Sequence, residues 1–312
     1  MCNALTRLAL VLVFCSTSVA LAAEKVELKL RLEEGKDYLV ESVSDMTTQM
    51  QMMGMSQNMV VQSGTGLTFH VLKVDPKTGN MDVKVTYSWV SMKQQGGPTG
   101  PVSYDSRTHT GPVPPTAQGL AGLIGQGYEV TLDSKGCVVE VRGVQEFFDK
   151  MMEGMPAESR SMMEPMMKKQ FGDSAMRATI EQATRIIPDR AVSPGESWQV
   201  QIVMGNPMPM TIDNTYTLKE VKGDAVVLDF TSNVKPAPAE QSGMELPGGG
   251  KMTIEVNGTQ AGQITVDRKT GLLRSNTSSQ DFTGTTTITN PQAPAPMVGT
   301  MTMKGTTTIT RK

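Results

Sequence analysis

The fold class is decided by LTFHVLKV (67–74), DPKTGN (75–80) and MDVKVTYSWV (81–90). The two outer segments are rich in β-branched and aromatic residues, which favour extended strands. Between them, Pro76 suits the second position of a turn, and Gly79 tolerates the positive φ that such turns require. This stretch therefore predicts a β-hairpin. Similar strand and turn patterns occur on both sides of it in the sequence.

Strand patterns dominate the rest of the chain. Residues 128–132 and 137–141 flank a DSKG turn and predict a second hairpin. In 26–32 (VELKLRL) apolar and charged residues alternate, which is typical of a half-buried strand. Further strands are expected at 38–43, 198–203, 210–221, 225–233, 251–256, 263–266, 285–289 and 300–310, with Asn257-Gly258 separating 251–256 from 263–266.

The middle of the chain has a different period. Apolar residues recur at helical spacing through Val144, Phe147, Phe148, Met151, Met152 and Met155, which predicts an amphipathic helix. Further helices are expected at 158–171 and 173–187, ended by Gly172 and Pro188. The predicted class is mainly β with an α insert, in which two related antiparallel curved sheets are separated by a Met-rich helical segment. The expected divisions are 1–23, 24–143, 144–190 and 191–312.

The two β halves resemble each other in three features that occur in the same order. EGKDY (34–38) matches PGESW (194–198), and LKV (72–74) matches LKEV (218–221). The hairpin YEVTLD (128–133), with Gly136, matches GQITVD (262–267), with Gly271. These matches predict an internal duplication.

The segment IPDRAVSPGESW (187–198) resembles a motif of an exported bacterial protein family of unknown function. That family also has an L-x-x-G-x-x-Y opening, here Leu32 to Tyr38, and a G-x-[IV]-x-[VL]-[DS]-x-x-x-G hairpin, here Gly262 to Gly271. The resemblance implies no known activity. At the level of fold alone, a curved sheet covered by helices is similar to the half-barrels of LolA-like and LppX-like carriers of lipids or lipoproteins.

Residues 1–23 predict export. Arg7 precedes the apolar run 8–14, and Ala20, Ala22 and Ala23 form a small-residue cleavage site, as in a secretory signal peptide. Removal of this segment leaves 28 Lys and Arg against 31 Asp and Glu, a balance that argues against nucleic-acid binding. The expected localisation is the periplasm or the extracellular space. After cleavage the protein is not expected to be an integral membrane protein.

Known catalytic motifs are absent from the sequence, and we expect a non-catalytic protein without a cofactor. Cys137 alternates with apolar residues and is expected to be a core residue, since Cys2 and Cys15 leave with residues 1–23. His70 lies within a strand pattern, and His109 lies in a Pro/Gly-rich loop. Three aspartates open turns, where their side chains can accept hydrogen bonds from turn amides: Asp75, Asp133 and Asp267. This turn role accounts for their presence, and no catalytic role is needed.

Methionine is the unusual feature, with 25 residues in the chain. Thioethers can fill gaps in a core poor in aromatic residues, or form a plastic surface for apolar ligands or an envelope partner. The candidate ligand-binding residues are Phe147, Phe148, Met151, Met152 and Met155, in a cleft between sheet and helices. Thioether sulfur is also a soft ligand for Cu(I), and Met50, Met52, Met53 and Met55 are the candidates for that alternative. An unrecognised enzyme is the second alternative.

Overall fold

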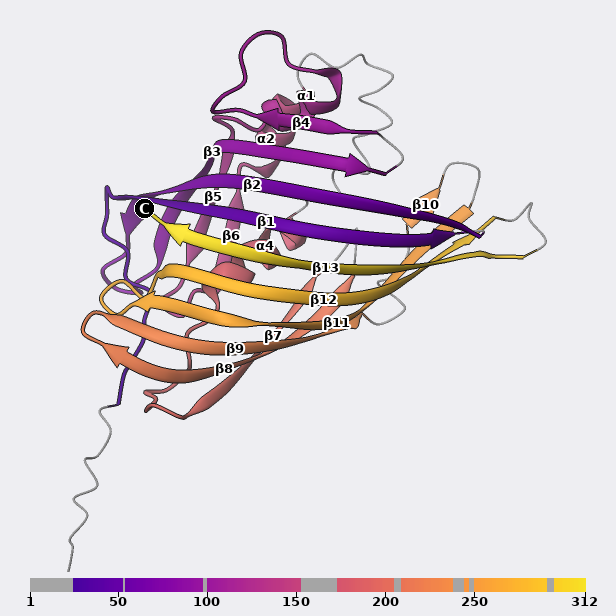
Figure 1. The fold of residues 1–312 in the computed structure, drawn as a ribbon. Coiled ribbons are helices and arrows are strands. Elements are labelled where there is room, and N and C mark those ends of the chain that lie inside the picture. The colour runs from indigo at the N-terminus through magenta and orange to yellow at the C-terminus, as the bar shows by residue number, and fades with distance from the viewer. Residues whose placement is uncertain are drawn as a thin grey trace, which may run out of the picture.

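The computed structural model describes residues 25–52, 54–97, 100–152, 173–204, 209–237, 244–246, 250–290 and 295–312. In this part of the chain, 13 strands form one antiparallel, curved and unclosed sheet (Figure 1). Along the sheet the strand order is β6-β5-β3-β2-β1-β13-β12-β11-β9-β8-β7, with β4 beside β3 and β10 beside β11. The predicted mainly β class with a small α insert is confirmed.

The first half of the sheet contains β1 (Asp37–Met52), β2 (Met55–Val74), β3 (Met81–Gly96), β4 (Val102–Asp105), β5 (Gly127–Leu132) and β6 (Val138–Arg142). The second half contains β7 (Ser197–Met204), β8 (Met210–Lys222), β9 (Ala225–Pro236), β10 (Met244–Leu246), β11 (Gly250–Asp267), β12 (Leu273–Thr289) and β13 (Met297–Arg311). The helices are η1 (Pro115–Ala117), α1 (Gln118–Ala121), α2 (Val144–Met151) and α4 (Asp173–Thr184).

Most of the predicted elements are present. The 67–90 hairpin is β2–β3, and its turn is closed by a hydrogen bond from the Gly79 amide to the Asp75 carbonyl. The second hairpin is β5–β6, in which the Gly136 amide donates to the Asp133 carbonyl. Helices α2 and α4 lie within the predicted helical ranges, whereas the expected helix at 158–171 lies outside the described residues.

Three expectations need correction. The two β halves are not separate sheets, because β13 pairs with β1 and joins them. Residues 26–32 alternate between buried and exposed as predicted, but outside the sheet: Val26 makes one isolated bridge, to Val192. The Asn257-Gly258 pair does not separate two strands, since β11 runs through it, paired with β12 at both residues and with β9 from Gly258 onward.

The two halves have matching strand orders and matching contacts at their first turns. Strands β1-β2-β3-β5-β6 and β7-β8-β9-β11-β12 are both consecutive in the sheet. The Gly35 amide donates to the carbonyl of Val71, and the Gly195 amide donates to the carbonyl of Leu218. Both glycines have positive φ, which suits glycine in such turns. These contacts agree with the proposed correspondence between Tyr38 and Trp198, and the duplication itself stays a prediction.

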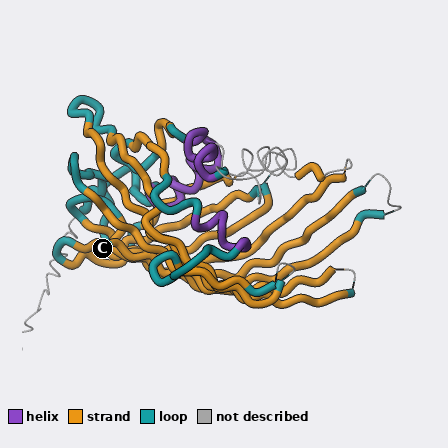
Figure 2. Tube along the Cα trace, turned by 90° about the horizontal axis from the view of Figure 1, so that it is seen from above, coloured by secondary structure: helices purple, strands orange, loops and turns teal. Residues whose placement is uncertain are grey.

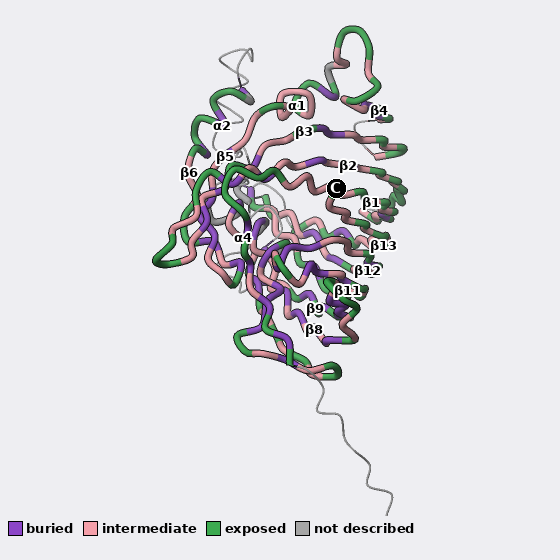
Figure 3. Tube along the Cα trace, turned by 90° about the vertical axis from the view of Figure 1, so that its left-hand side faces the viewer, coloured by how far each residue is buried: buried purple, intermediate pink, exposed green. Residues whose placement is uncertain are grey.

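The core lies on the concave side of the sheet, at one end of the strands. Figure 2 shows helices on that side, with strands that extend well beyond them. The core is closed by α2, α4 and the extended segment 26–32, whose residues Val26, Leu28, Leu30 and Leu32 are at most 5% exposed. Exposed positions line the opposite, convex side (Figure 3). Alternate residues of each strand therefore face different environments.

The convex side is mostly polar, with scattered exposed valines, and Trp89 is a large apolar residue that packs against it. A bulge after Tyr87 turns Trp89 to this side, where its ring covers Gly66 and its Nε1 donates to the Glu41 carboxylate at 3.2 Å. The guanidinium of Arg107 lies 3.9 Å from the centre of the ring. A Cβ atom on Gly66 would come within 2.1 Å of the indole, so only glycine fits beneath it.

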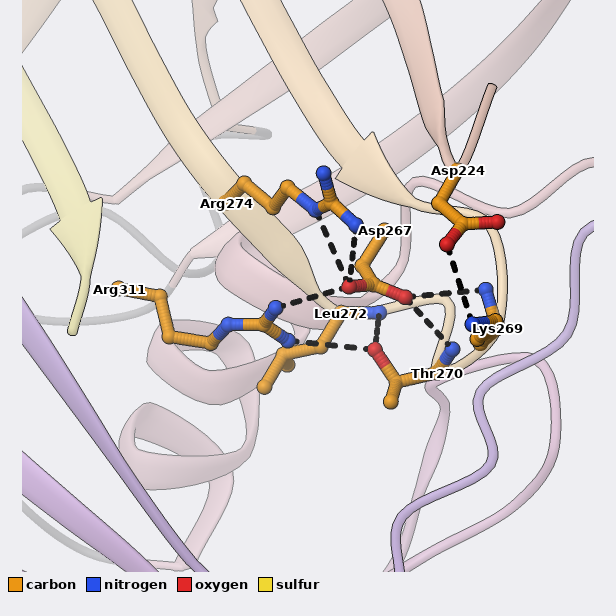
Figure 4. Close-up of polar contacts among 7 residues, drawn as sticks. All are labelled: Asp224, Asp267, Lys269, Thr270, Leu272, Arg274 and Arg311. Carbon is orange, nitrogen blue, oxygen red and sulfur yellow. Dashed lines mark hydrogen bonds and ion pairs between the residues drawn. The ribbon is translucent and has the colours of Figure 1, made fainter. Parts of the chain in front are cut away.

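Asp267 ties the end of β13 to the turn between β11 and β12 (Figure 4). Its carboxylate accepts hydrogen bonds from Arg274 and Arg311 and from the amides of Lys269 and Thr270. Burial alone would raise the pKa of the Asp267 carboxyl, but the bonds from Arg274, the Thr270 amide and Arg311 outweigh it. Together they hold this pKa well below its usual range.

Asp267→Asn is expected to lower the free energy of unfolding by about 3 kcal/mol at neutral pH, because Arg311 and Arg274 lose their anion. In the unmodified protein this contribution is complete above about pH 4 and is lost as the pH falls toward the lowered pKa. Urea unfolding of both proteins across this range checks the prediction. An unchanged loss of stability below pH 4 in the variant would contradict it.

Candidate apolar binding face

Three bands of side chains cross the concave side of the sheet. The first is the core described above. The second is a row of hydrogen-bonded polar side chains, which we call the polar row: Asn214, Ser232, Gln260, Ser278, Gln280, Thr307 and Ser44. The third lies further along the strands and is apolar, and we call it the distal face. Strand register determines the bands, because directly paired residues point to the same side.

Short hydrogen bonds hold the polar row together. The Ser232 hydroxyl donates to the side-chain oxygen of Asn214 at 2.6 Å, and both residues are buried. The amide of Gln280 donates to the Thr307 hydroxyl at 2.7 Å, which in turn donates to Ser44 at 3.2 Å. The row spans strands of both halves and separates the core from the distal face.

The distal face surrounds a small cluster of buried residues, Ile212, Val234 and Val256. Packed against it and only partly buried are Met204, Met210, Ile254, Phe282, Met301 and Met303. Register extends this face to β1 and β2, since Met50 pairs with Met301, and Thr48 pairs with both Met303 and Met59. Met46, Met50, Met52 and Met59 are partly buried.

Glycines make room for these thioethers. A Cβ atom on Gly284 would lie 2.6 Å from the Met301 methyl carbon, and one on Gly305 would lie 2.4 Å from the Met46 sulfur. One on Gly299 would lie 3.1 Å from the Met52 methyl carbon. Glycine inside a strand marks a close approach by another group, and here a methionine side chain and the backbone carbonyl of a paired strand both lie close.

Three of the predicted ligand-binding residues belong to the core. Phe147 and Phe148 are 2% exposed, and Met152 is 1% exposed. The Phe147 ring lies 6.0 Å from that of Tyr87 and 6.1 Å from that of Tyr128. Nothing is described of the Met151 side chain or of Met155. The binding role of these residues stays a prediction.

The residues of the copper alternative are only partly brought together. Met50 and Met52 lie on the distal face, and Met55, which pairs with Met52 and points to the same side, is 71% exposed at the end of the β1–β2 hairpin. Met53 lies outside the described residues. The set that shares this face with Met50 includes Met301 and Met303, which are 251 and 253 residues further along the chain. The alternation of Met301 and Met303 in a strand pattern indicates that both point to the same side of a strand. It does not indicate that this strand pairs with β1.

Both histidines have local partners. His70 Nδ1 lies 2.6 Å from the Asp37 carboxylate, and His109 contacts the carbonyl of Pro112. Burial raises the pKa of the Cys137 thiol, which disfavours a reactive thiolate. No group of three or more His, Cys, Asp or Glu side chains is placed to hold a metal within the described ranges. No helix in those ranges has the length and apolar character to cross a membrane.

Comparison with known proteins identifies the family but not the activity. Residues 78–273, more than half of the chain, match DUF6263, a family of unknown function, and the chain belongs to that family. No curated protein matches it. A solved structure described as "Lipid-protein interactions in lipovitellin" is similar at a TM-score of 0.49 and 9% identity. The match covers 90% of this chain but only 25% of the lipovitellin chain, and at this level it carries no argument about function.

Ser232→Ala tests the polar row. It should lower the free energy of unfolding by about 1–3 kcal/mol, because the buried oxygen of Asn214 loses its donor. Its neighbour Thr231 is exposed on the convex side, so Thr231→Ala should change stability by no more than about 0.5 kcal/mol. Chemical denaturation measures both. Equal effects would show that the hydrogen bond in the row adds no stability.

Proposed function

We propose that this protein is exported and binds an apolar, lipid-like ligand on its distal face. The observation that carries the proposal is the contrast along one side of the sheet. Near the helices, concave-side residues such as Val83, Leu228 and Val266 are fully buried. On the distal face, Phe282 and Met301 remain partly exposed. Apolar side chains gathered in this way mark binding sites more often than single exposed ones do.

The size of the distal face fits extended hydrocarbon chains. It runs across eight neighbouring strands, from Met204 on β7 to Met59 on β2. Seven strand spacings correspond to roughly 34 Å. Along β1 it covers Met46 to Met52, which is roughly 20 Å of strand. Such an area could take more than one acyl chain side by side.

The chemistry of the face also favours hydrocarbon. Methionine side chains are unbranched and flexible, so they can adapt to chains of different shape without strain. Ligand sites are mostly apolar, with few polar groups that fix orientation, and the polar row supplies such groups along one border. The export part of the proposal rests on residues 1–23, which lie outside the described residues.

Met301→Asp is expected to weaken the binding of a fluorescent fatty acid by about tenfold or more, because a charge would lie against the hydrocarbon. Displacement titrations with the purified protein measure this. Thr300→Asp is the matched control, since Thr300 is adjacent in β13 but exposed on the convex side. Equal binding by Met301→Asp and Thr300→Asp, or the absence of fatty-acid binding in the unmodified protein, would contradict the proposal.

Met301→Leu separates the lipid and copper alternatives. Leucine keeps the apolar surface but removes the thioether, so fatty-acid binding should be retained within a few-fold. A Cu(I) site that used Met50 and Met301 would instead lose affinity in this variant. Metal analysis of the purified protein and a Cu(I) competition titration complete the comparison.

A further inference from the structure

Two neighbouring hairpins of the sheet carry no charged side chain over most of their length. Asp, Glu, Lys and Arg are all absent between Asp45 and His70, and again between Asp281 and Lys304. At the chain average of 19% charged residues, the first segment would carry about five and the second about four. The first segment contains the β1–β2 hairpin, and the second contains the β12–β13 hairpin.

The sheet places these two uncharged segments side by side. Strands β1 and β13 are paired from Val40 and Arg311 to Met52 and Gly299. Within these two hairpins the last charges before the tip lie on the convex side, where Lys304 lies 2.9 Å from Asp281, and the next charges beside the tip are Glu255 and Lys251 of β11. Beyond Asp45, β1 continues for seven residues to Met52, which corresponds to roughly 24 Å. We call this charge-free end of the two hairpins the tip.

The tip also exposes large apolar side chains. On the convex side, Val60 is 42% exposed in β2 and Val298 is 56% exposed at the start of β13. The polar side chains of these hairpins are mostly Thr, Gln and Ser. The free energy needed to bring such side chains into a membrane interface is far smaller than that for charged groups. The concave side of the same tip is the distal face, with Met50, Met52 and Met301.

We propose that the tip docks on a lipid surface and that the ligand enters the distal face there. This inference deepens the proposed function and rests on it. A water-facing surface normally carries charges, and their absence over two adjacent hairpins removes the main cost of contact with lipid. The tip has no Lys or Arg with which to attract anionic headgroups, so the contact is with uncharged or zwitterionic lipid.

The test uses vesicles of phosphatidylcholine, a zwitterionic lipid, and a flotation assay with the purified protein. The unmodified protein should bind, and binding should persist in about 1 M salt, where the screening length is only about 3 Å. The double variant Val60→Asp/Val298→Asp, which adds charges on the convex side of the tip only, should bind at least several-fold less. The control is Val139→Asp, because Val139 is 51% exposed on β6 at the core end of the sheet.

A second measurement separates this inference from the proposed function. Fatty acid added from ethanol, without vesicles, should reach the distal face in the double variant as well as in the unmodified protein. Uptake of the same fatty acid from vesicles should be several-fold slower in the double variant only. Normal fatty-acid binding without vesicle binding would overturn the docking and leave the proposed function standing. Docking that needs anionic lipid, or that the double variant retains, would also overturn it.

Discussion

The ladder between β1 and β13 is the constraint on which the rest of the structure depends. It joins two consecutive series of strands into one sheet, and it places Met50 opposite Met301 and Ser44 beside Thr307. Without it, the polar row and the distal face would each be divided between two halves. Asp267 holds the end of this ladder through Arg311, so a buried charge at the core end stabilises an arrangement whose apolar surface lies far along the strands.

A single sheet with one curvature explains how the chain has both a core and a candidate binding face. Each long strand presents alternate residues to the concave side, and the helices cover only part of that side. Where α2 and α4 are present, the alternating side chains are buried. Further along, the same alternation leaves methionines partly exposed. Up to the tip, charged residues such as Asp281 and Lys304 keep the convex side solvated, so the two sides have separate roles there.

Local features of this fold could be predicted from the sequence, and long-range features could not. The Asp75 to Gly79 turn and the 144–151 helix follow from residues close in the chain. The 26–32 segment has the alternation of a strand, but alternation reports only that one side is buried and not what the backbone pairs with. The helical stripe with Phe147 was correctly identified as apolar, and only the fold shows that the helix covers the core. The distal face needs the pairing of β1 with β13, which no short pattern encodes.

That same ladder also bears on how the chain folds. Ser44 and Thr307, which share a hydrogen bond, are 263 positions apart. Closing so large a loop costs conformational entropy before the pairing of β1 with β13 contributes favourable free energy. Domains dominated by such distant contacts fold slowly. Until β13 arrives, the inner edges of β1 and β12 have unpaired backbone groups, and the uncharged hairpins beside them offer little repulsion to a second chain. The assembly that unites the sheet therefore leaves a long interval in which aggregation competes with folding.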